Sequence, residues 1–479
     1  MNFILMASTF IFPLITFPYI SRILLPEGNG KIAFATSIIS YFSMVAMLGI
    51  PTYGIRACAK VRNNKEELSK TVHELFIINV TTTIITYITL FISIFTIAKF
   101  ENYRVLLMVT GSGIILNTFG MNWLYSALEQ YAYITVRSIV FKVLSIILMF
   151  LFVHKIENYV IYAAITVFAS SGSYILNIIN IRKYIYFKPF KNYNFKQHVK
   201  PILTFFAMTV ATSIYLNLDA TMLGFIKGDN EVGLYNAAIK IRAILTSLVA
   251  SLGTVLLPRM SFLIKTNQMD EFKKITAKAI NFVLILSLPL TIYFVSFSKE
   301  VIILLSGINF LGSVPAMQII TPTIIFVGLT NILGIQVLVP QNREKCVLIS
   351  VIVGALTDIL LNIIFIPKMG AAGAALGTLI AEFTVLVTQI AFLKDFLIEV
   401  IKNNRLRFVI ISSIMSSIGI ILFKRIYIDS VFMSLVLSAT TFFGLYGMIL
   451  LIQKEPLVYG LIMEGLNKLK GHNHKKTNT

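Results

Sequence analysis

The sequence predicts an all-α polytopic membrane protein with about fourteen transmembrane helices. Of its 479 residues, 57% are apolar and only 13% are charged, and the mean hydropathy is +0.84. Globular domains usually carry about twice that share of charge, so a soluble protein is excluded. Runs of about twenty apolar residues recur along the chain, as helices that cross about 30 Å of hydrocarbon require. Barrel strands, which alternate over about ten residues, do not fit this pattern.

The expected spans follow one another from the first residues almost to the end of the chain. A short Pro/Gly turn separates the first two windows, and an arginine, Arg22 or Arg56, lies near one end of each. The first apolar run has no small-residue cleavage site, so we interpret it as a span rather than a signal peptide. The predicted spans are about 3–25, 33–55, 74–98, 105–127, 133–153, 159–181, 203–226, 234–257, 279–297, 314–338, 346–366, 372–393, 408–424 and 431–452.

Basic residues concentrate on every second connection between the spans. The connections after even-numbered spans, together with the C-terminal tail, carry about 27 lysines and arginines, against about ten on the other connections. By the positive-inside rule, both termini are expected in the cytoplasm. The same distribution accounts for most of the formal net charge of +20, so the charge gives no reason to expect a nucleic-acid partner.

Two halves of the chain resemble each other. Residues 34–38, FATSI, align with residues 235–239, YNAAI, and Arg56 aligns with Arg259, at an offset of about 200 residues. Six spans precede the basic linker 183–200, and an even number of spans gives two units the same orientation in the membrane. We therefore predict two parallel six-helix lobes. The expected organisation is an N-terminal lobe at 1–190, a C-terminal lobe at 195–395, two additional helices at 405–455 and a basic cytoplasmic tail at 456–479.

No catalytic, metal or nucleotide motif is visible in the sequence. Cys58 and Cys346 lie far apart, and the histidines show no metal-ligand spacing except in the C-terminal HNH, which lies in a basic, polar tail. The segment Gly28–Asn29–Gly30 lacks the Lys-Ser/Thr of a phosphate-binding loop. We therefore expect no enzyme and no cofactor. In the absence of an ATPase motif, energy must come from a gradient, a partner or the substrate itself.

Few ionisable residues lie within the predicted spans, and each is a candidate site residue. Such a side chain costs about 2.5–3.5 kcal/mol at a lipid-facing helix centre, so it should face a cavity or a partner. Lys142 lies near mid-depth, where its amine cannot easily reach the membrane surface, and it is the strongest of these candidates. The residues concerned are Arg22, Arg137, Lys142, Asp219, Lys240, Arg242, Asp358 and Glu382.

The positions of the turns suggest partners for some of these residues. Asp219 and Lys240 lie at similar depths on the seventh and eighth spans, so a salt bridge is available to them. Such a pair is also consistent with a purely structural role that holds the two helices together. Arg137 lies about one turn inside the cytoplasmic end of its span, where it could snorkel beside Glu129.

Two acidic residues of the C-terminal half lack an expected partner. Asp358 and Glu382 have no basic residue at an obviously matching depth. Loss of water could keep their carboxyl groups protonated, which would suit proton coupling, or they could hydrogen-bond to neighbouring helices. Arg56 and Arg259 are explained better by the positive-inside rule than by a site.

Several motifs resemble a known family. They include FPYISRILLPEGNGKIAFATSI (17–38), LGIPTYGIRACAKVR (48–62), YLNLDATMLGFIKGDNEVGLYNAAIKI (215–241) and IPKMGAAGAALGTLIAE (366–382). From residue 10 to about 393 the chain resembles the polysaccharide-transporter (Wzx-type flippase) branch of the multidrug/oligosaccharidyl-lipid/polysaccharide exporter superfamily. The resemblance implies a flippase that moves isoprenoid-diphosphate-linked oligosaccharide repeat units to the outer leaflet by alternating access, for assembly of a capsule, O-antigen or exopolysaccharide.

The same resemblance implies a bacterial cytoplasmic membrane protein with two lobes around a cationic central cavity. Expected partners are the lipid-linked oligosaccharide, membrane lipids, a glycan polymerase with other assembly proteins, and a proton or sodium as coupling ion. Where relatives often have Asp-Trp, this chain has Asn122-Trp123, so any role of that acid is absent or has moved, for example to Glu129. The substrate-binding positions carried over are Arg22, Arg56, Arg137, Lys142, Lys240 and Arg259, with Asp219 as the acidic position and Asp358 and Glu382 as further ion-pair or coupling candidates.

Other functions remain open at this point. A related exporter could carry a peptidoglycan lipid precursor or a cationic drug, but a drug cation would favour acidic groups in the N-terminal lobe, where the charges within the spans are all basic. A membrane glycan polymerase would need a long outside loop or a carboxylate-bearing catalytic domain. No connection after an odd-numbered span exceeds about twenty residues, so the flippase is favoured.

Overall fold

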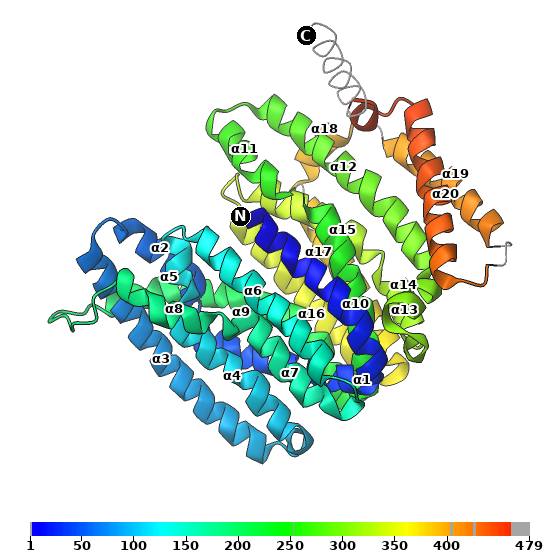
Figure 1. The fold of residues 1–479 in the computed structure, drawn as a ribbon. Coiled ribbons are helices and arrows are strands. Elements are labelled where there is room, and N and C mark those ends of the chain that lie inside the picture. The colour runs from blue at the N-terminus through cyan, green and yellow to red at the C-terminus, as the bar shows by residue number, and fades with distance from the viewer. Residues whose placement is uncertain (1, 252, 403–405, 425–427, 461–479) are drawn as a thin grey trace, which may run out of the picture. The chain divides into compact units, whose positions relative to one another are not determined.

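The computed structural model describes residues 2–251, 253–402, 406–424 and 428–460 (Figure 1). These residues form helices and turns and contain no strand, as the sequence predicts. Eleven of the described helical stretches are long and apolar enough to cross a membrane. The first of them, Phe12–Val61, overlaps two predicted spans, 3–25 and 33–55. The protein is thus an all-α polytopic membrane protein.

The chain divides into two compact units, and each is described by itself. The first unit comprises Met1–Ala237, Leu305–Phe310 and Asn362–Ala374. Four helices contribute residues to both units: α10 (Asp229–Ala250), α13 (Ser298–Ser306), α16 (Glu344–Met369) and α17 (Ala371–Phe392). The other elements of the first unit are α1 (Asn2–Met47), α2 (Ile50–Val61), α3 (Lys65–Thr96), η1 (Ala98–Tyr103), α4 (Arg104–Gly120), α5 (Asn122–Ala127), α6 (Tyr131–Phe152), η2 (Ile156–Asn158), α7 (Tyr159–Val167), η3 (Phe168–Gly172), α8 (Tyr174–Asn180), η4 (Ile181–Lys183), α9 (Lys196–Ile226) and η5 (Ile308–Phe310).

The turn expected between the first two spans is a kink inside α1. Leu25 has φ 57° and ψ 179°, and helical structure resumes directly after it. Two glycines make a reciprocal close approach beside this kink. A Cβ atom on Gly30 would lie 1.7 Å from the Asp229 carbonyl oxygen, and one on Gly233 would lie 1.8 Å from that of Pro26. The backbones of α1 and α10 can therefore meet here only because both positions are glycine.

The long helix α3 shows which face of a helix meets lipid. Ile84, Ile88 and Phe91 are more than half exposed, although they are among the most apolar residues of the helix. The polar side chains Asn79 and Thr83 are buried instead, and the Thr83 hydroxyl hydrogen-bonds that of Thr118 on α4 at 2.8 Å. This distribution reverses that of a soluble protein, as expected where hydrocarbon surrounds the helices and polar groups must find partners inside. Figure 1 shows α3 and α4 running side by side.

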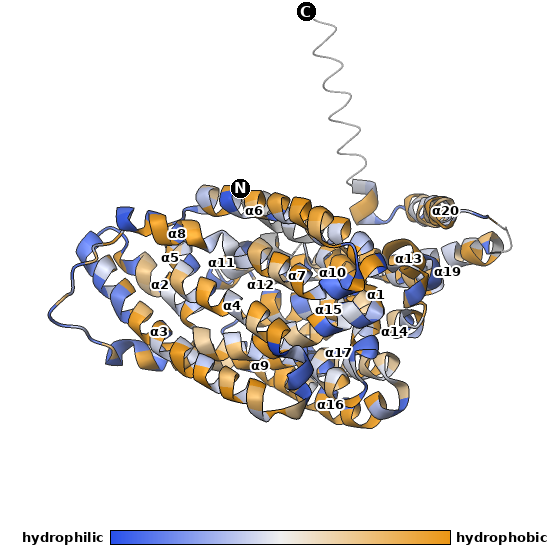
Figure 2. Ribbon diagram, turned by 60° about the horizontal axis from the view of Figure 1, so that its bottom comes forward, coloured by the Kyte–Doolittle hydropathy of each residue, from blue (hydrophilic) through white to orange (hydrophobic). Residues whose placement is uncertain are grey.

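The second unit comprises Ala238–Leu304, Leu311–Leu361 and Ala375–Thr479. Within it, α12 packs against α15, α18 and α19, and α19 packs against α20. Hydrophobic residues run along most of the long helices of both units, for example α3, α6 and α20 (Figure 2). The further elements of this unit are α11 (Gly253–Lys265), α12 (Met269–Ser296), α14 (Ser313–Ile320), α15 (Thr323–Thr330), η6 (Asn331–Leu338), α18 (Lys394–Lys402), α19 (Leu406–Phe423) and α20 (Val431–Ile452).

Candidate functional site

Lys142 lies on α6 and directs its amine toward the N-terminal part of α1. Its Nζ donates a hydrogen bond to the Ser8 hydroxyl at 2.8 Å and lies 5.7 Å from the centre of the Phe12 ring. No carboxylate forms an ion pair with this amine within the part of the chain that the structure describes. The half-buried cation is thus held by a neutral hydroxyl and an aromatic face.

A cavity of about 330 Å³ adjoins the Lys142 amine. Its apolar wall comes from Phe12, Pro13, Met149, Ile165 and Ala169. The polar groups besides the amine are hydroxyls, and they come from Thr16, Ser145, Tyr162, Thr166 and Ser170. One fixed cation beside these hydroxyls suits an anionic group such as a phosphate, and the hydroxyls of Thr166 and Ser170 also donate to the backbone carbonyls of Ala163 and Val167.

A π-helical segment forms one side of this cavity. Between α7 and α8 the chain widens into the π-helix η3, whose residues Ala169 and Ser170 line the cavity. Gly172 ends the segment, and a Cβ atom there would lie 2.9 Å from the Phe168 ring and 3.1 Å from the Phe141 ring. Short π-helical turns occur often at functional sites because they displace side chains from the regular helical positions. Here the displaced turn lies opposite Lys142.

Arg137, five residues before Lys142 on the same helix, is buried rather than snorkelled. Its guanidinium is 4% exposed, donates from Nη1 to the Ser173 hydroxyl at 2.7 Å, and donates from Nη2 to the Asn122 side-chain oxygen. The Tyr133 and Tyr174 rings lie 5.6 Å and 5.1 Å from its central carbon. The prediction that this arginine could snorkel beside Glu129 is therefore wrong.

The acid that the sequence suggested for Arg137 is used elsewhere. Glu129 forms an ion pair with Arg62 at 2.7 Å, and both side chains are largely exposed. Asn122 is instead the direct partner of Arg137. A buried guanidinium is therefore held by neutral groups, and no carboxylate pairs with it within the described residues.

Asp219 on α9 is buried and joins three helices of the first unit. The Tyr235 hydroxyl on α10 donates to its Oδ2, and the Asn362 amide on α16 donates to its Oδ1 at 2.6 Å. Its exposed fraction is 7%. The carboxylate thus serves as a hydrogen-bond acceptor shared between α10 and α16.

Glu382 has a basic partner, contrary to the expectation from the sequence. Its Oε1 accepts from Nη2 of Arg242 at 2.7 Å, and the Arg242 Nε donates to the Thr323 hydroxyl at 2.7 Å. The two side chains are 15% and 8% exposed, so this is a nearly buried ion pair within the second unit. The pair accounts for both charges, which makes a freely protonating Glu382 unnecessary.

The remaining predicted residues are not gathered at the Lys142 cavity. Arg22 is exposed, and its Nη1 donates to the Pro18 carbonyl at 2.6 Å. Arg56 is exposed on α2, and Arg259 forms an exposed ion pair with Glu271 at 2.8 Å. Lys240 and Asp358 belong to the second unit, where Lys240 is half-buried and Asp358 is buried. Of the six basic candidates, Lys142 is the one that lines this cavity.

Metal binding has no support in the described part of the chain. There, no group of three or more histidine, cysteine or acidic side chains could hold a metal ion. Cys58 is a buried free thiol and Cys346 a half-buried one. The C-terminal HNH of the sequence lies outside the described residues.

The fold and these charged groups define a polytopic helical membrane protein with isolated polar clusters inside its spans. Residues 2–264, more than half of the chain, match the polysaccharide biosynthesis protein family, and the chain belongs to this family. A protein of Escherichia coli (strain K12) named "Putative O-antigen transporter" is 24% identical over 394 residues, which cover 82% of this chain and 95% of that protein.

Two solved structures show the same fold. The lipid II flippase MurJ, in an inward closed conformation, superposes with a TM-score of 0.66 at 19% identity and covers 94% of this chain and 99% of its own. An inward-facing multidrug resistance MATE family transporter of the MOP superfamily superposes with a TM-score of 0.61 at 14% identity, covering 79% of this chain and 92% of its own. At these identities the likeness concerns the fold alone.

Proposed function

We propose that this chain is a flippase that carries isoprenoid-diphosphate-linked oligosaccharide repeat units from the cytoplasmic to the outer leaflet. The observation that carries the proposal is the Lys142 amine, which faces a hydroxyl-lined cavity within the membrane-spanning part of the chain. Membership of the polysaccharide biosynthesis protein family and similarity to the Escherichia coli relative support a cargo made of sugars. The protein acts as a transporter and not as an enzyme.

Electrostatics favours a cargo of this kind. A diphosphate carries about two negative charges, and a fixed cation in a hydrated cavity offsets the cost of bringing them into the membrane. In a cell with a negative interior, outward movement gains about 2.3 kcal/mol per charge per 100 mV. The membrane potential can therefore supply driving force without an ATPase. Lys142 provides the anion-binding group, and the hydroxyls of Thr166 and Ser170 are placed to meet phosphate or sugar oxygens.

The cellular setting belongs to the same proposal. The protein lies in the bacterial cytoplasmic membrane with both termini in the cytoplasm, as the distribution of basic residues predicts. It delivers its cargo to a glycan polymerase for assembly of a capsule, O-antigen or exopolysaccharide. A proton or sodium ion can couple to transport at a buried acid such as Asp219. The carboxylate of this residue accepts hydrogen bonds from Tyr235 and Asn362.

The test is transport of a labelled isoprenoid-diphosphate oligosaccharide across sealed vesicles that hold the purified protein. We expect the wild type to flip the lipid under an inside-negative potential and Lys142→Ala to abolish flipping. Lys155→Ala is the matched control, because this exposed lysine lies just beyond the end of α6 and outside the cavity. If Lys142→Ala and Lys155→Ala lose flipping to the same extent, the result contradicts a specific role for Lys142.

Cargo identity is tested in the same vesicles. Parallel reactions contain a labelled peptidoglycan lipid precursor and a labelled organic cation. If the wild type moves the cation and not the lipid-linked glycans, the drug-export alternative replaces the proposal. If it moves the peptidoglycan precursor alone, the class of transporter stands and the cargo is corrected. A polymerase would lengthen the glycan, which mass analysis of the recovered lipid detects.

A further inference from the structure

The first turns of α9 extend beyond the length that a bilayer needs. The helix has 31 residues, which corresponds to about 46 Å at 1.5 Å per residue. The hydrocarbon core is only about 30 Å thick, so roughly ten residues must lie in the headgroup region or beyond it. The segment before α9 is rich in lysine, which favours the N-terminal end of the helix as the protruding part.

One face of these turns is fixed to the protein. His198 and Ile202 are 3% and 1% exposed. The Nε2 atom of His198 lies 2.7 Å from the Glu74 carboxylate of α3, and its Nδ1 lies 2.8 Å from the Tyr53 hydroxyl of α2. The same Glu74 carboxylate accepts from the backbone amide of Asn194 at 2.6 Å. The start of α9 and the segment that leads into it are thus anchored to α2 and α3.

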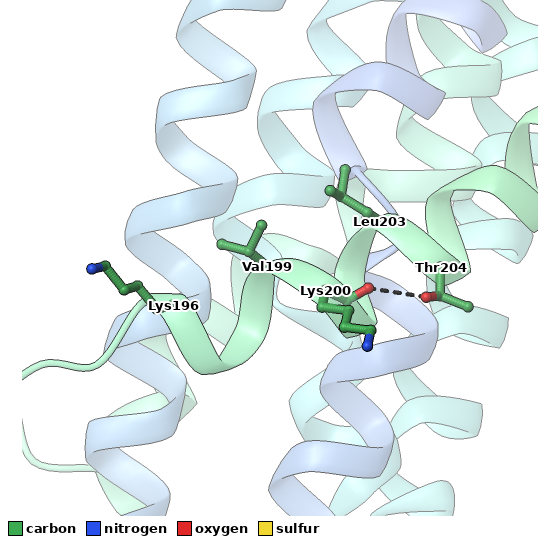
Figure 3. Close-up of a pocket in the computed structure, with 5 residues that line it drawn as sticks. All are labelled: Lys196, Val199, Lys200, Leu203 and Thr204. Atoms are coloured by element: carbon green, nitrogen blue, oxygen red, sulfur yellow. Dashed lines mark hydrogen bonds between the residues drawn. The ribbon is translucent and has the colours of Figure 1, made fainter.

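The opposite face of the same turns is free. Val199 and Leu203 are 49% and 50% exposed and flank an open depression of about 630 Å³ that Lys196, Lys200 and Thr204 complete (Figure 3). In this view the lysine side chains extend away from the apolar pair. Neither lysine pairs with a carboxylate within the described residues. We call these five residues the Lys196–Thr204 face.

The preceding segment adds cations and exposed aromatic rings. Tyr186 is 44% exposed and Phe187 60% exposed, and the amines of Lys65 and Lys188 lie 4.7 Å and 5.6 Å from the Tyr186 ring centre. Aromatic rings and lysines together are typical of segments that lie at the boundary between hydrocarbon and headgroups. The charge of this region is complementary to an anionic leaflet.

We propose that the Lys196–Thr204 face binds the phosphate headgroup of an anionic phospholipid in the adjacent leaflet. Lys196 and Lys200, one helical turn apart, meet the phosphate, and Val199 and Leu203 contact the upper part of an acyl chain. The His198–Glu74 contact holds this face toward the lipid. The leaflet is the cytoplasmic one if the orientation proposed above is correct; the binding itself is independent of the cargo and of Lys142.

The experiment measures binding of acyl-labelled phosphatidylglycerol and phosphatidylcholine to the full-length protein in detergent micelles. Wild type is expected to prefer phosphatidylglycerol. Lys196→Gln/Lys200→Gln should bind it about thirtyfold more weakly, since each surface lysine contributes about fivefold. Lys196→Arg/Lys200→Arg should retain the affinity, and thermal unfolding of each variant verifies that it is folded.

The matched control removes two exposed lysines elsewhere, Lys60→Gln/Lys265→Gln, and should leave the affinity unchanged. An equal loss in the control would overturn the proposal in favour of diffuse attraction. Inorganic diphosphate that displaces phosphatidylglycerol at micromolar concentration would point to a soluble anion, and binding of isoprenoid diphosphate to the exclusion of phosphatidylglycerol would point to a cargo site. Either result overturns the assignment to bilayer lipid, while the Lys142 transport assay stays interpretable.

Discussion

Arg137 on α6 donates a hydrogen bond to the side-chain oxygen of Asn122 on α5, so a neutral amide holds a buried guanidinium. This bond already has an ionised donor, and a carboxylate in place of the amide would add an ionised acceptor opposite it. We therefore expect Asn122→Asp to raise the free energy of unfolding by about 1–2 kcal/mol, because the arginine is already buried and gains an anionic partner. Thermal unfolding of the purified protein in detergent measures the change.

The control for this substitution removes the acceptor. Asn122→Ala leaves a buried charged donor without its partner and should cost about 1–3 kcal/mol. If Asn122→Asp proves less stable than Asn122→Ala, the two side chains do not interact as described.

Removing the charge of Lys142 should have opposite effects on stability and on transport. Lys142→Met removes a half-buried cation that has no carboxylate partner among the described residues, so the melting temperature should rise. The gain should be smaller than the about 2.5–3.5 kcal/mol that a lipid-facing lysine costs. Flipping should be lost, whereas Lys142→Arg should keep both the charge and measurable flipping. A less stable Lys142→Met would indicate that the amine serves to hold the fold.

The Arg242–Glu382 pair should behave as a coupled unit. Removing either partner leaves a nearly buried charge without compensation, and we expect Arg242→Met or Glu382→Gln to cost about 3–5 kcal/mol. The double variant Arg242→Met/Glu382→Gln should cost much less than the two single losses together. A double-mutant cycle on unfolding in detergent measures this coupling, and simple additivity would show that the pair contributes nothing.

The reciprocal glycines of α1 and α10 should not tolerate a side chain. Gly30→Ala and Gly233→Ala each place a methyl group against a backbone carbonyl. We therefore expect each to lower the free energy of unfolding by about 3 kcal/mol or more, and to give a poor yield of monodisperse protein. Gly444→Ala on α20 is the matched control, since no atom lies within 4 Å of its added methyl group. That variant should be unchanged or more stable by about 0.5–1 kcal/mol.

The helical fold follows from the sequence because each span must satisfy its own backbone hydrogen bonds in hydrocarbon. Length and apolar composition therefore locate the helices with little help from long-range contacts. The same reasoning selected Lys142, because a cation near mid-depth needs a cavity or a partner. The cavity beside it, the π-helical turn at Ser170 and the hydrogen bond to Ser8 depend on packing that no local pattern encodes.

Partner choice was harder to predict than position. Glu382 and Arg242 are 140 residues apart, so their pairing depends on how helices of the second unit pack. Arg137 was expected about one turn inside the cytoplasmic end of its span, where it could snorkel, because depth was counted along the chain. The turn that leads into α5 instead places the Asn122 side chain in contact with its guanidinium. Asn362 was not among the predicted site residues, but its place within an apolar span is a usable signal, since a polar group there needs a partner.

The contact between Gly30 and Gly233 has an evolutionary consequence. These two residues lie close to the offset of about 200 residues at which the sequence predicts two related halves, and each glycine lies against the backbone of the other segment. Where two copies of one segment pack on each other, a larger residue in either copy damages both. A substitution in either segment at this contact therefore affects the other segment as well. A chain built by duplication would thus retain, at this one crossing, the symmetry of the dimer from which it arose.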